Sequence, residues 1–477
     1  YYTYHLLGKI YALFPYSDIL GILSVQIAIS MGMIGWSAAY YMFHRKKSLS
    51  ADVNDWYVLS PSMIYSLCSC VVAMRIYPTW LITYALFPLI LVKMDDLIEN
   101  KKWFGYILLL GVCVCWEIQL ALFVCIYLFM RFFTYRFSDI RDFITKGIRF
   151  GICSIWGAGC GFFSIARTLQ AYQNSYYQEN DSAFQGFGFY HNFLKQWKDF
   201  LPLSNVIAVS NDDGAVIGFV GMVSLFLIVT FMVSKSVSRR EKVARIIPII
   251  IILVSVNEKA LSYVWNGFHY QTMVPARYMF ILIFLLGEIA YDCVIVIRKI
   301  TKTEVALMLC ALVTLCLVII GWRTDLDVWG SIAWIAVVYG CIAIGFMWIK
   351  RTEKIRQMLM ILLAVELSIQ FCYSVNSVNT SDLMTVYGNI NNITEKYSTI
   401  TDLAVCGVRS INISSYNDTS NIGQYYNSGN INIFNSYVDF AQMKTNRLFG
   451  YSYGGNNIKS NYCSSLEGSS LAGVKYI

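Results

Sequence analysis

The sequence has few charged side chains: 14% of its 477 residues are Asp, Glu, Lys or Arg, whereas 57% are apolar. Soluble domains carry about 25% charged residues. The scarcity of charge argues against an ordinary soluble enzyme. The basic residues sit in short clusters between apolar runs, so the net charge of +8 indicates membrane orientation and not nucleic-acid binding.

The sequence also lacks the short motifs of soluble enzymes. It has no P-loop and no HExxH. Its four His are scattered and no CxxC pair is present, so a metal site built from protein ligands alone is not expected. Most Cys lie inside apolar runs, as Cys113 and Cys125 do, where they act as small hydrophobic residues.

Long apolar runs are abundant, and each bilayer-spanning helix needs about 20 apolar residues. We therefore predict a mainly α, polytopic transmembrane helical bundle over residues 1–373, with about ten to twelve crossings. The runs are 19–43, 56–74, 79–94, 104–130, 147–169, 214–234, 246–263, 277–297, 304–321, 328–349 and 357–373.

Basic clusters set the predicted orientation, because they favour the cytoplasmic side. They are His44–Lys47, Lys101–Lys102, Arg131–Arg149, Lys235–Arg245, Arg298–Lys302 and Lys350–Arg356. Run 104–130 is flanked by basic residues at both ends and carries Glu117 at its middle. We predict a hairpin of two short helices with Glu117 at its outer tip. The alternative, a single span with Glu117 at the bilayer centre, would cost about 2.5–3.5 kcal/mol.

This orientation places loop 170–213 and residues 374–477 outside the cytoplasm. The aromatic content of the loop argues against disorder. Residues 374–477 are rich in Asn, Ser, Tyr and Gly, with short alternating stretches such as Ile431–Phe434. We predict a partial extracytoplasmic domain there, of mixed or β-containing structure. The chain starts without Met and stops in what looks like a strand, so we expect both ends to be missing.

Three predicted outer turns carry candidate chemistry. Trp265–Tyr278 is rich in aromatic and hydrogen-bonding groups, and Arg277 is expected in the first turn of the next helix, where a phosphate could bind. An interfacial aromatic belt with a snorkelling Arg is the alternative. Arg75 could also hold phosphate, or its turn could be a simple anchored hairpin. The third site is Glu117 with Gln119.

Two further carboxylates, Glu288 and Glu366, fall within predicted spans. We expect both to face the interior of the bundle as hydrogen-bonding groups, because a charge facing lipid is costly.

Several stretches together resemble the bacterial YfhO family. Trp265–Tyr278 followed by Met279–Phe284 is similar to its "GF…P.RY.F…F" signature. Other similar stretches, in matching order, are Tyr11–Pro15, Leu59–Tyr65, Thr79–Trp80, Phe87–Leu91, run 104–130, and the closing Ser470–Ile477. The resemblance covers essentially the whole chain.

YfhO-like proteins resemble the GT-C class of membrane glycosyltransferases. The resemblance implies transfer of a sugar from a polyprenyl-phosphate carrier to an extracytoplasmic cell-envelope acceptor, such as teichoic acid or another surface polymer. It implies a multi-pass protein of the plasma membrane whose partners are the lipid-linked sugar, the polymer acceptor and the bilayer. Arg277 and Arg75 would bind the donor phosphate. Residues for the sugar or lipid would be Trp265, Asn266, His269, Tyr270 and Tyr278.

The catalytic base cannot be transferred from the family. In GT-C enzymes the key carboxylate usually lies in a first outer loop, most of which we expect to be missing here, and Glu117 is a candidate second carboxylate. The sequence leaves open whether a divalent metal joins the phosphate. A transporter or flippase of lipid-linked glycan, or a non-catalytic envelope-assembly protein, remains an alternative. The sequence shows no clear internal repeat, a feature that transporters often have.

Overall fold

The computed structural model describes residues 13–14, 19–48, 55–75, 77–173, 184, 186–190, 200, 218–268, 270, 277–296 and 352–376, four short strands, and isolated positions 301, 306, 310 and 338. The chain divides into two compact units. One comprises Tyr1, Ala166–Ala183 and Asn379–Ile477, and the other comprises Tyr2–Ile165 and Phe184–Val378. The second unit holds most of the described helices.

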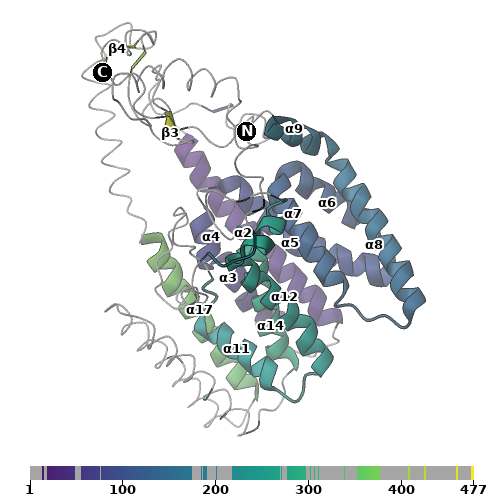
Figure 1. The fold of residues 1–477 in the computed structure, drawn as a ribbon. Coiled ribbons are helices and arrows are strands. Elements are labelled where there is room, and N and C mark those ends of the chain that lie inside the picture. Colours follow the sequence, from purple (N-terminus) through teal and green to yellow (C-terminus); the bar gives the residue numbers. More distant parts are fainter. Residues whose placement is uncertain are drawn as a thin grey trace. The chain divides into compact units, whose positions relative to one another are not determined.

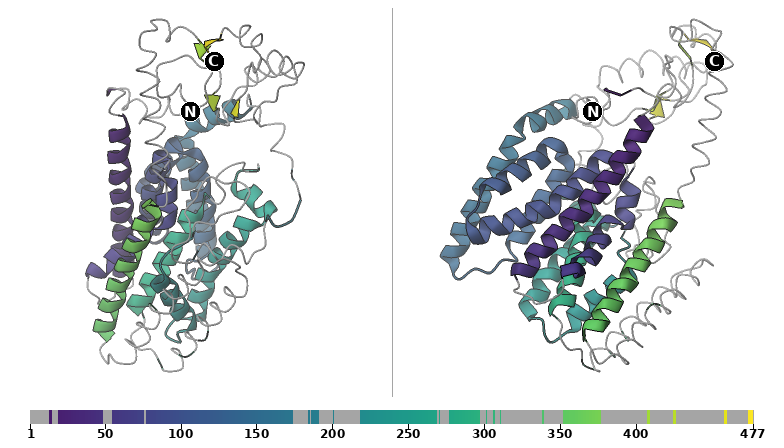
Figure 2. Two further views of the ribbon diagram at one scale, coloured as in Figure 1. Left: turned by 90° about the vertical axis from the view of Figure 1, so that its left-hand side faces the viewer. Right: turned by 180° about the vertical axis from the view of Figure 1, so that it is seen from behind.

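The described helices follow one another along the chain as labelled in Figure 1. They are α2 (Ile19–Ser48), η3 (Asp55–Val58), α3 (Leu59–Ser66), α4 (Ser69–Met74), α5 (Pro78–Asn100), α6 (Phe104–Trp116), α7 (Ile118–Phe132), α8 (Ile140–Cys160), α9 (Phe162–Gln173), α11 (Met222–Val233), α12 (Arg239–Asn257), α13 (Lys259–Trp265), α14 (Met279–Val296) and α17 (Thr352–Asn376). Helices α6, α7 and α8 lie side by side (Figure 1, Figure 2).

Local sequence signals explain several helix ends. Asp139 caps α8 by accepting the N–H of Asp142 at 2.7 Å. Ser238 and Glu241 form a reciprocal capping box at the start of α12. Proline at position 78 opens α5, where its missing N–H costs nothing.

The predicted mainly α character is confirmed, but several predicted runs form broken helices. Run 56–74 is divided into η3, α3 and α4, and run 246–263 is divided between α12 and α13 at Glu258. Run 147–169 bends by 63° between α8 and α9. In the described part of run 214–234, residues 218–234, the helix is α11, which has 12 residues. Runs 304–321 and 328–349 lie almost entirely outside the described residues.

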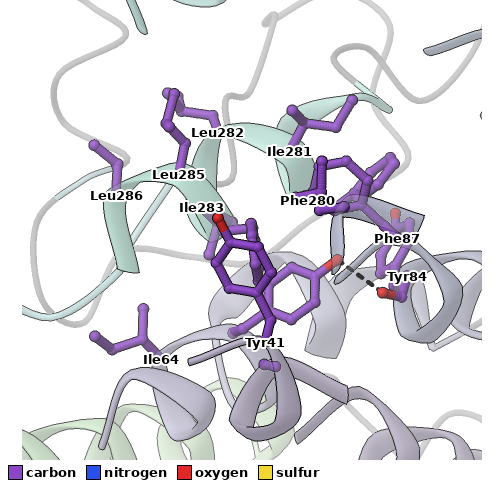
Figure 3. Packing of buried hydrophobic residues seen from close by; sticks show 14 of the residues in the cluster. Tyr41, Ile64, Tyr84, Phe87, Phe280, Ile281, Leu282, Ile283, Leu285 and Leu286 are labelled. Carbon is purple, nitrogen blue, oxygen red and sulfur yellow. Dashed lines mark hydrogen bonds between the residues drawn. The ribbon is translucent and has the colours of Figure 1, made fainter. Parts of the chain in front are cut away.

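Helix α14 forms the centre of the core. Its residues from Met279 to Leu285 are at most 1% exposed. Phe280 stacks on Tyr84 of α5 with ring centroids 4.3 Å apart, and Phe284 meets Tyr41 of α2 edge-on at 5.0 Å. Figure 3 shows Tyr41, Tyr84 and Phe280 together with Phe87. The ring of Phe87 contacts both Phe280 and Phe284. Aromatic packing therefore joins α2, α5 and α14.

Several helices expose long apolar stripes. On α2 the residues recur every three or four positions and are 42–61% exposed: Val25, Ile29, Met33, Trp36, Tyr40 and Phe43. On α17 the equivalent stripe is Ile361, Val365, Ile369 and Tyr373. Continuous exposed apolar faces of this length are unfavourable in water but suit contact with lipid chains.

Among the described residues, two helices are long and apolar enough to cross a bilayer, judged by length and composition. They contain Gly21–Lys47 of α2 and Gln357–Ser374 of α17. The bent pair of α8 and α9 would add a third if it forms one span. The predicted larger number of crossings stays a prediction.

In the other unit, four very short strands make two pairs. Strand β1 (Gly407–Val408) pairs in parallel with β4 (Val474–Tyr476), and β2 (Gln424–Tyr425) pairs antiparallel with β3 (Ile458–Lys459). Strands of two or three residues do not define a sheet. The β-containing C-terminal domain therefore stays a prediction.

Candidate functional site

The turn between α6 and α7 is the centre of the first candidate site. Glu117 joins the helices with extended backbone angles (φ −150°, ψ 96°). Tyr106 near the start of α6 and Phe132 at the end of α7 both contact Phe150 of α8. Since both ends meet one residue, α6 and α7 fold back on each other. The predicted hairpin is confirmed, with Glu117 buried at its tip.

Three segments distant in sequence meet beside this tip. Trp116 Nε1 donates to the carbonyl oxygen of Thr79 at 2.9 Å. Arg277 Nη1 donates to Gln119 Oε1 at 2.6 Å. The same guanidinium lies over the ring of Trp80, 5.2 Å from its centroid. We call these five residues the Arg277 cluster. It unites parts of the three turns that the sequence analysis treated separately.

Two neutral groups orient the Arg277 guanidinium in this cluster. The amide oxygen of Gln119 accepts one N–H, and the indole of Trp80 attracts the cation through its face. Neither group carries a formal charge. The planar guanidinium is thereby held in one orientation, which is the arrangement that favours bidentate binding of a phosphate or carboxylate.

Arg277 lies slightly earlier, relative to the start of the following helix, than the sequence analysis predicted. Helix α14 begins at Met279, so Arg277 lies in the turn just before it and not in its first turn. The next residue, Tyr278, stacks on Trp265 with ring centroids 4.5 Å apart. This stacking fixes the turn and directs the chain into the core.

Arg75, the second predicted phosphate residue, lies in the turn between α4 and α5. It is half-buried, and its Nη1 donates to the carbonyl oxygen of Val72 at 3.3 Å. Tyr77 stacks on Trp80 with ring centroids 4.3 Å apart. Arg75 thus lies in the turn that leads into α5, whose first residues include Thr79 and Trp80 of the Arg277 cluster.

Two of the predicted sugar-binding aromatics pack the interior of the bundle. Trp265 is 3% exposed and Tyr278 is 1% exposed. They stack on each other, and both rings contact Phe123 of α7. In this arrangement neither ring offers an open face, because their large apolar surfaces are buried.

The remaining predicted sugar-binding residues, Asn266, His269 and Tyr270, come just after the end of α13 in the sequence. Asn266 is 2% exposed, and its Nδ2 donates to a backbone carbonyl of α13 at 2.8 Å. Tyr270 lies 4.9 Å from Tyr263, measured between ring centroids. His269 lies outside the described residues. Phe268, which the prediction did not include, is 65% exposed and adopts a left-handed φ of 64°.

Part of the predicted outer loop 170–213 packs against the start of α13. Gly188 N donates to Glu258 Oε1 at 3.2 Å, and Lys259 N donates to the carbonyl oxygen of Gly188 at 2.8 Å. Burial tends to raise the pKa of Glu258, but backbone N–H donors, including those of Leu261 and Gly188, lower it below its ordinary value. Glu258 therefore acts as an ionised cap that also fixes the loop.

A second polar cluster, which the sequence analysis did not predict, lies inside the bundle. Glu288 of α14 is 0% exposed. Its Oε1 accepts the hydroxyl of Tyr41 at 2.6 Å and Nη2 of Arg131 at 3.2 Å. Its Oε2 lies 2.6 Å from Nη1 of Arg245. The prediction that Glu288 faces the interior is confirmed.

One helical turn further on, Asp292 completes this cluster. Arg45 donates to it through Nε at 2.8 Å and Nη2 at 2.7 Å, a bidentate pair. Arg245 Nη2 also donates to it at 2.9 Å. We call Tyr41, Arg45, Arg131, Arg245, Glu288 and Asp292 the Glu288 network. It joins α2, α7, α12 and α14.

The three arginines of the Glu288 network come from three different basic clusters. In the sequence they were assigned to cytoplasmic orientation, and nothing in the clusters distinguishes an inward residue from a solvated one. The available signal was the pair Glu288 and Asp292, four positions apart in an apolar run. Such a pair lies on one helix face and requires cationic partners when buried.

No group of three or more His, Cys, Asp or Glu side chains gathers as potential metal ligands within the described part of the chain. A divalent metal at the Arg277 cluster would need most of its ligands from a phosphate and water, or from residues that the structure does not describe.

Broken apolar helices, lipid-facing stripes and buried polar clusters define a helical membrane protein. The family model described as bacterial membrane protein YfhO matches residues 1–477. The chain therefore belongs to the YfhO family, as its sequence resemblance predicted. Comparisons with curated proteins and with solved structures found no match.

Proposed function

We propose that this protein is a membrane glycosyltransferase that moves a sugar from a polyprenyl-phosphate donor to an extracytoplasmic cell-envelope acceptor, such as teichoic acid or another surface polymer. The observation that carries the proposal is the Arg277 cluster. An arginine oriented by Gln119 and Trp80 beside the tip of a helical hairpin is suited to bind a lipid phosphate.

Arg277 binds the donor phosphate in this proposal, and Arg75, in the turn just before the helix that carries Trp80, adds a second positive charge. As the acceptor oxygen bonds to the anomeric carbon, the phosphate leaves with the bonding electron pair. The added negative charge on the phosphate is stabilised by the guanidinium. His269 contacts the sugar or lipid in this proposal, while the buried side chains of Trp265, Asn266, Tyr270 and Tyr278 shape the site.

The acceptor hydroxyl must lose a proton during transfer, which calls for a general base. Glu117 is the one carboxylate of the hairpin turn Trp116–Gln119. It is next to Trp116 and two residues from Gln119, both members of the Arg277 cluster. We assign it as the candidate base among the described residues.

The test uses the protein in proteoliposomes with a radiolabelled polyprenyl-phosphate sugar and cell-envelope acceptor. Loss of an arginine that stabilises transition-state charge is expected to lower acceptor-dependent transfer about 100-fold in Arg277→Ala. Arg277→Lys should recover part of it, because the charge remains but the planar fork is lost. Arg136→Ala, which removes an exposed arginine, is the control.

Unchanged transfer in Arg277→Ala would refute the assignment of the phosphate site. Absence of transfer in the wild type, with acceptor and donor present, would refute the enzyme proposal. Adding a chelator to the same assay determines whether a divalent metal takes part.

One observation favours the second candidate, a flippase for lipid-linked glycan. Helix α11 begins at Met222, beside the middle of the candidate span of α17, where Glu366 lies. Helices interrupted within the bilayer are typical of transporters. Movement of labelled lipid between leaflets without release of its sugar would support this candidate over the transferase.

A further inference from the structure

Glu366 occupies an unusual position that the proposed function does not use. It lies at the middle of the apolar span Gln357–Ser374 and is 3% exposed. Its two carboxylate oxygens accept the N–H groups of Met222 at 2.5 Å and Val223 at 3.1 Å. These are the first two residues of α11, so a buried carboxylate caps a helix that starts inside the bundle.

The surroundings of this cap fit a carboxylate closely. Gly221 has a φ of 90°, which favours glycine. A Cβ added there would lie 3.0 Å from Leu363 Cδ1, 3.3 Å from Glu366 Oε2 and 3.5 Å from Ser224 Oγ. The carboxylate and the Ser224 hydroxyl therefore face the same small space beside Gly221.

The Ser224 hydroxyl is the second observation that points to a bound group. Ser224 is 0% exposed, and its Oγ has no hydrogen-bond partner among the described residues. An unsatisfied buried hydroxyl costs about 1–3 kcal/mol. It would be satisfied if the neighbouring acid carried a proton, because a carboxylic O–H can donate to Oγ.

The other ionisable groups near Glu366 can be named from the helices that pack against α17. The described helices that pack most closely against α17 are α3, α4 and α11. Helix α11 contains no ionisable side chain, α3 contributes Tyr65 and α4 contributes Cys70. On α17 itself, residues 362–370 include no second ionisable group. The two positive backbone N–H groups are thus the main electrostatic partners of the carboxylate in the described structure.

We propose that Glu366 is a proton-binding site built from the carboxylate, the N-terminus of α11 and the Ser224 hydroxyl. When Glu366 is ionised, it holds both backbone N–H groups. When it takes a proton from the aqueous phase, one oxygen keeps its N–H contact and the other donates its O–H to Ser224 Oγ. Proton binding therefore replaces one hydrogen bond from a backbone N–H of α11 with one from Glu366 to the Ser224 hydroxyl. The hydrogen bonds that join α11 to α17 change as a result.

This inference does not depend on the proposed transferase activity. The test is infrared spectroscopy of the full chain in lipid nanodiscs, with pH varied between about 5 and about 9, a range in which buried Glu can titrate. A protonated carboxyl band that appears as pH falls is expected in the wild type. Glu366→Gln, which imitates the protonated acid, should lack that band.

Two serine variants keep the test decisive if Glu366→Gln folds poorly. Ser224→Ala should retain the band but shift it to higher frequency, because the acid loses its acceptor. Ser368→Ala removes an exposed hydroxyl on α17, the helix that carries Glu366, and should leave the band unchanged. A wild-type spectrum equal to that of Glu366→Gln at every pH, or no shift in Ser224→Ala, would overturn the proposal.

Discussion

Replacing Glu288 with Gln should destabilise the protein strongly, because the change keeps the shape of the side chain and removes its charge. Glu288 is fully buried and lies within 3.4 Å of nitrogen atoms of Arg45, Arg131 and Arg245. In Glu288→Gln, only Asp292 remains as a carboxylate within the Glu288 network. Removing one partner of a buried ion pair costs about 3–5 kcal/mol.

The matched control is Glu241→Gln. Glu241 pairs with Arg136 at 2.9 Å, but the two side chains are 47% and 71% exposed. Solvent screens exposed pairs, which contribute about 0–1 kcal/mol. Glutamine also preserves the capping box at the start of α12. The same chemical substitution is therefore compared at a buried and an exposed site.

The assay is reversible unfolding in mixed micelles of increasing SDS content, followed by circular dichroism. Glu288→Gln should unfold at clearly lower SDS than Glu241→Gln. In the double variant Glu288→Gln/Arg131→Met, part of the loss should be recovered, because the uncompensated charge is smaller. Equal unfolding curves for Glu288→Gln and Glu241→Gln would refute the reasoning that the network stabilises the bundle.

Three further predictions concern other parts of the chain. Gly221→Ala should destabilise the folded protein by about 1–3 kcal/mol, because it places a side chain at a positive φ. Gly159→Ala, at a helical position with open space around it, should not destabilise the protein. Unfolding in SDS compares the two variants. The folded-state pKa of Glu258 is lowered, so its contribution to stability is fully present above its unfolded-state pKa of about 4.3 and is lost as pH falls through its folded-state pKa. Amide hydrogen exchange of α13 should therefore accelerate as pH falls through this range. The acceleration should be smaller in Glu258→Gln. With the predicted orientation, an impermeant maleimide should label Phe268→Cys in intact cells but Lys101→Cys only after lysis; the reverse pattern would contradict that orientation.

The sequence was sufficient to predict the helical class and the hairpin. The break at Glu117 follows from a simple conflict, because an apolar run flanked by basic residues on both ends cannot cross the bilayer once and keep both flanks on one side. The inward orientation of Glu288 and Glu366 follows equally from the cost of exposing a carboxylate to lipid.

The partners of these groups could not be predicted in the same way. Arg131 and Arg136 belong to one basic cluster, yet Arg131 is buried against Glu288 and Arg136 is largely exposed. Their difference arises from helix packing, which brings together residues 157 positions apart. Similarly, hydropathy did not reveal that α11 starts at Met222, because Gly218–Gly221 belongs to the same apolar run, 214–234, as the helix that follows.

The two polar clusters together fix the relative position of α7 and α14. Near the start of both helices, Gln119 bonds Arg277; further along, Arg131 contacts Glu288. Arg131 follows Gln119 by twelve positions and Glu288 follows Arg277 by eleven, so the paired contacts are separated by about 16–18 Å on both helices. Because these separations match, α7 and the first half of α14 run in the same direction and are held together at two levels. The Glu288 network therefore also helps to keep Gln119 and Arg277 in register, and a change at Glu288 should weaken the proposed phosphate site as well as the fold.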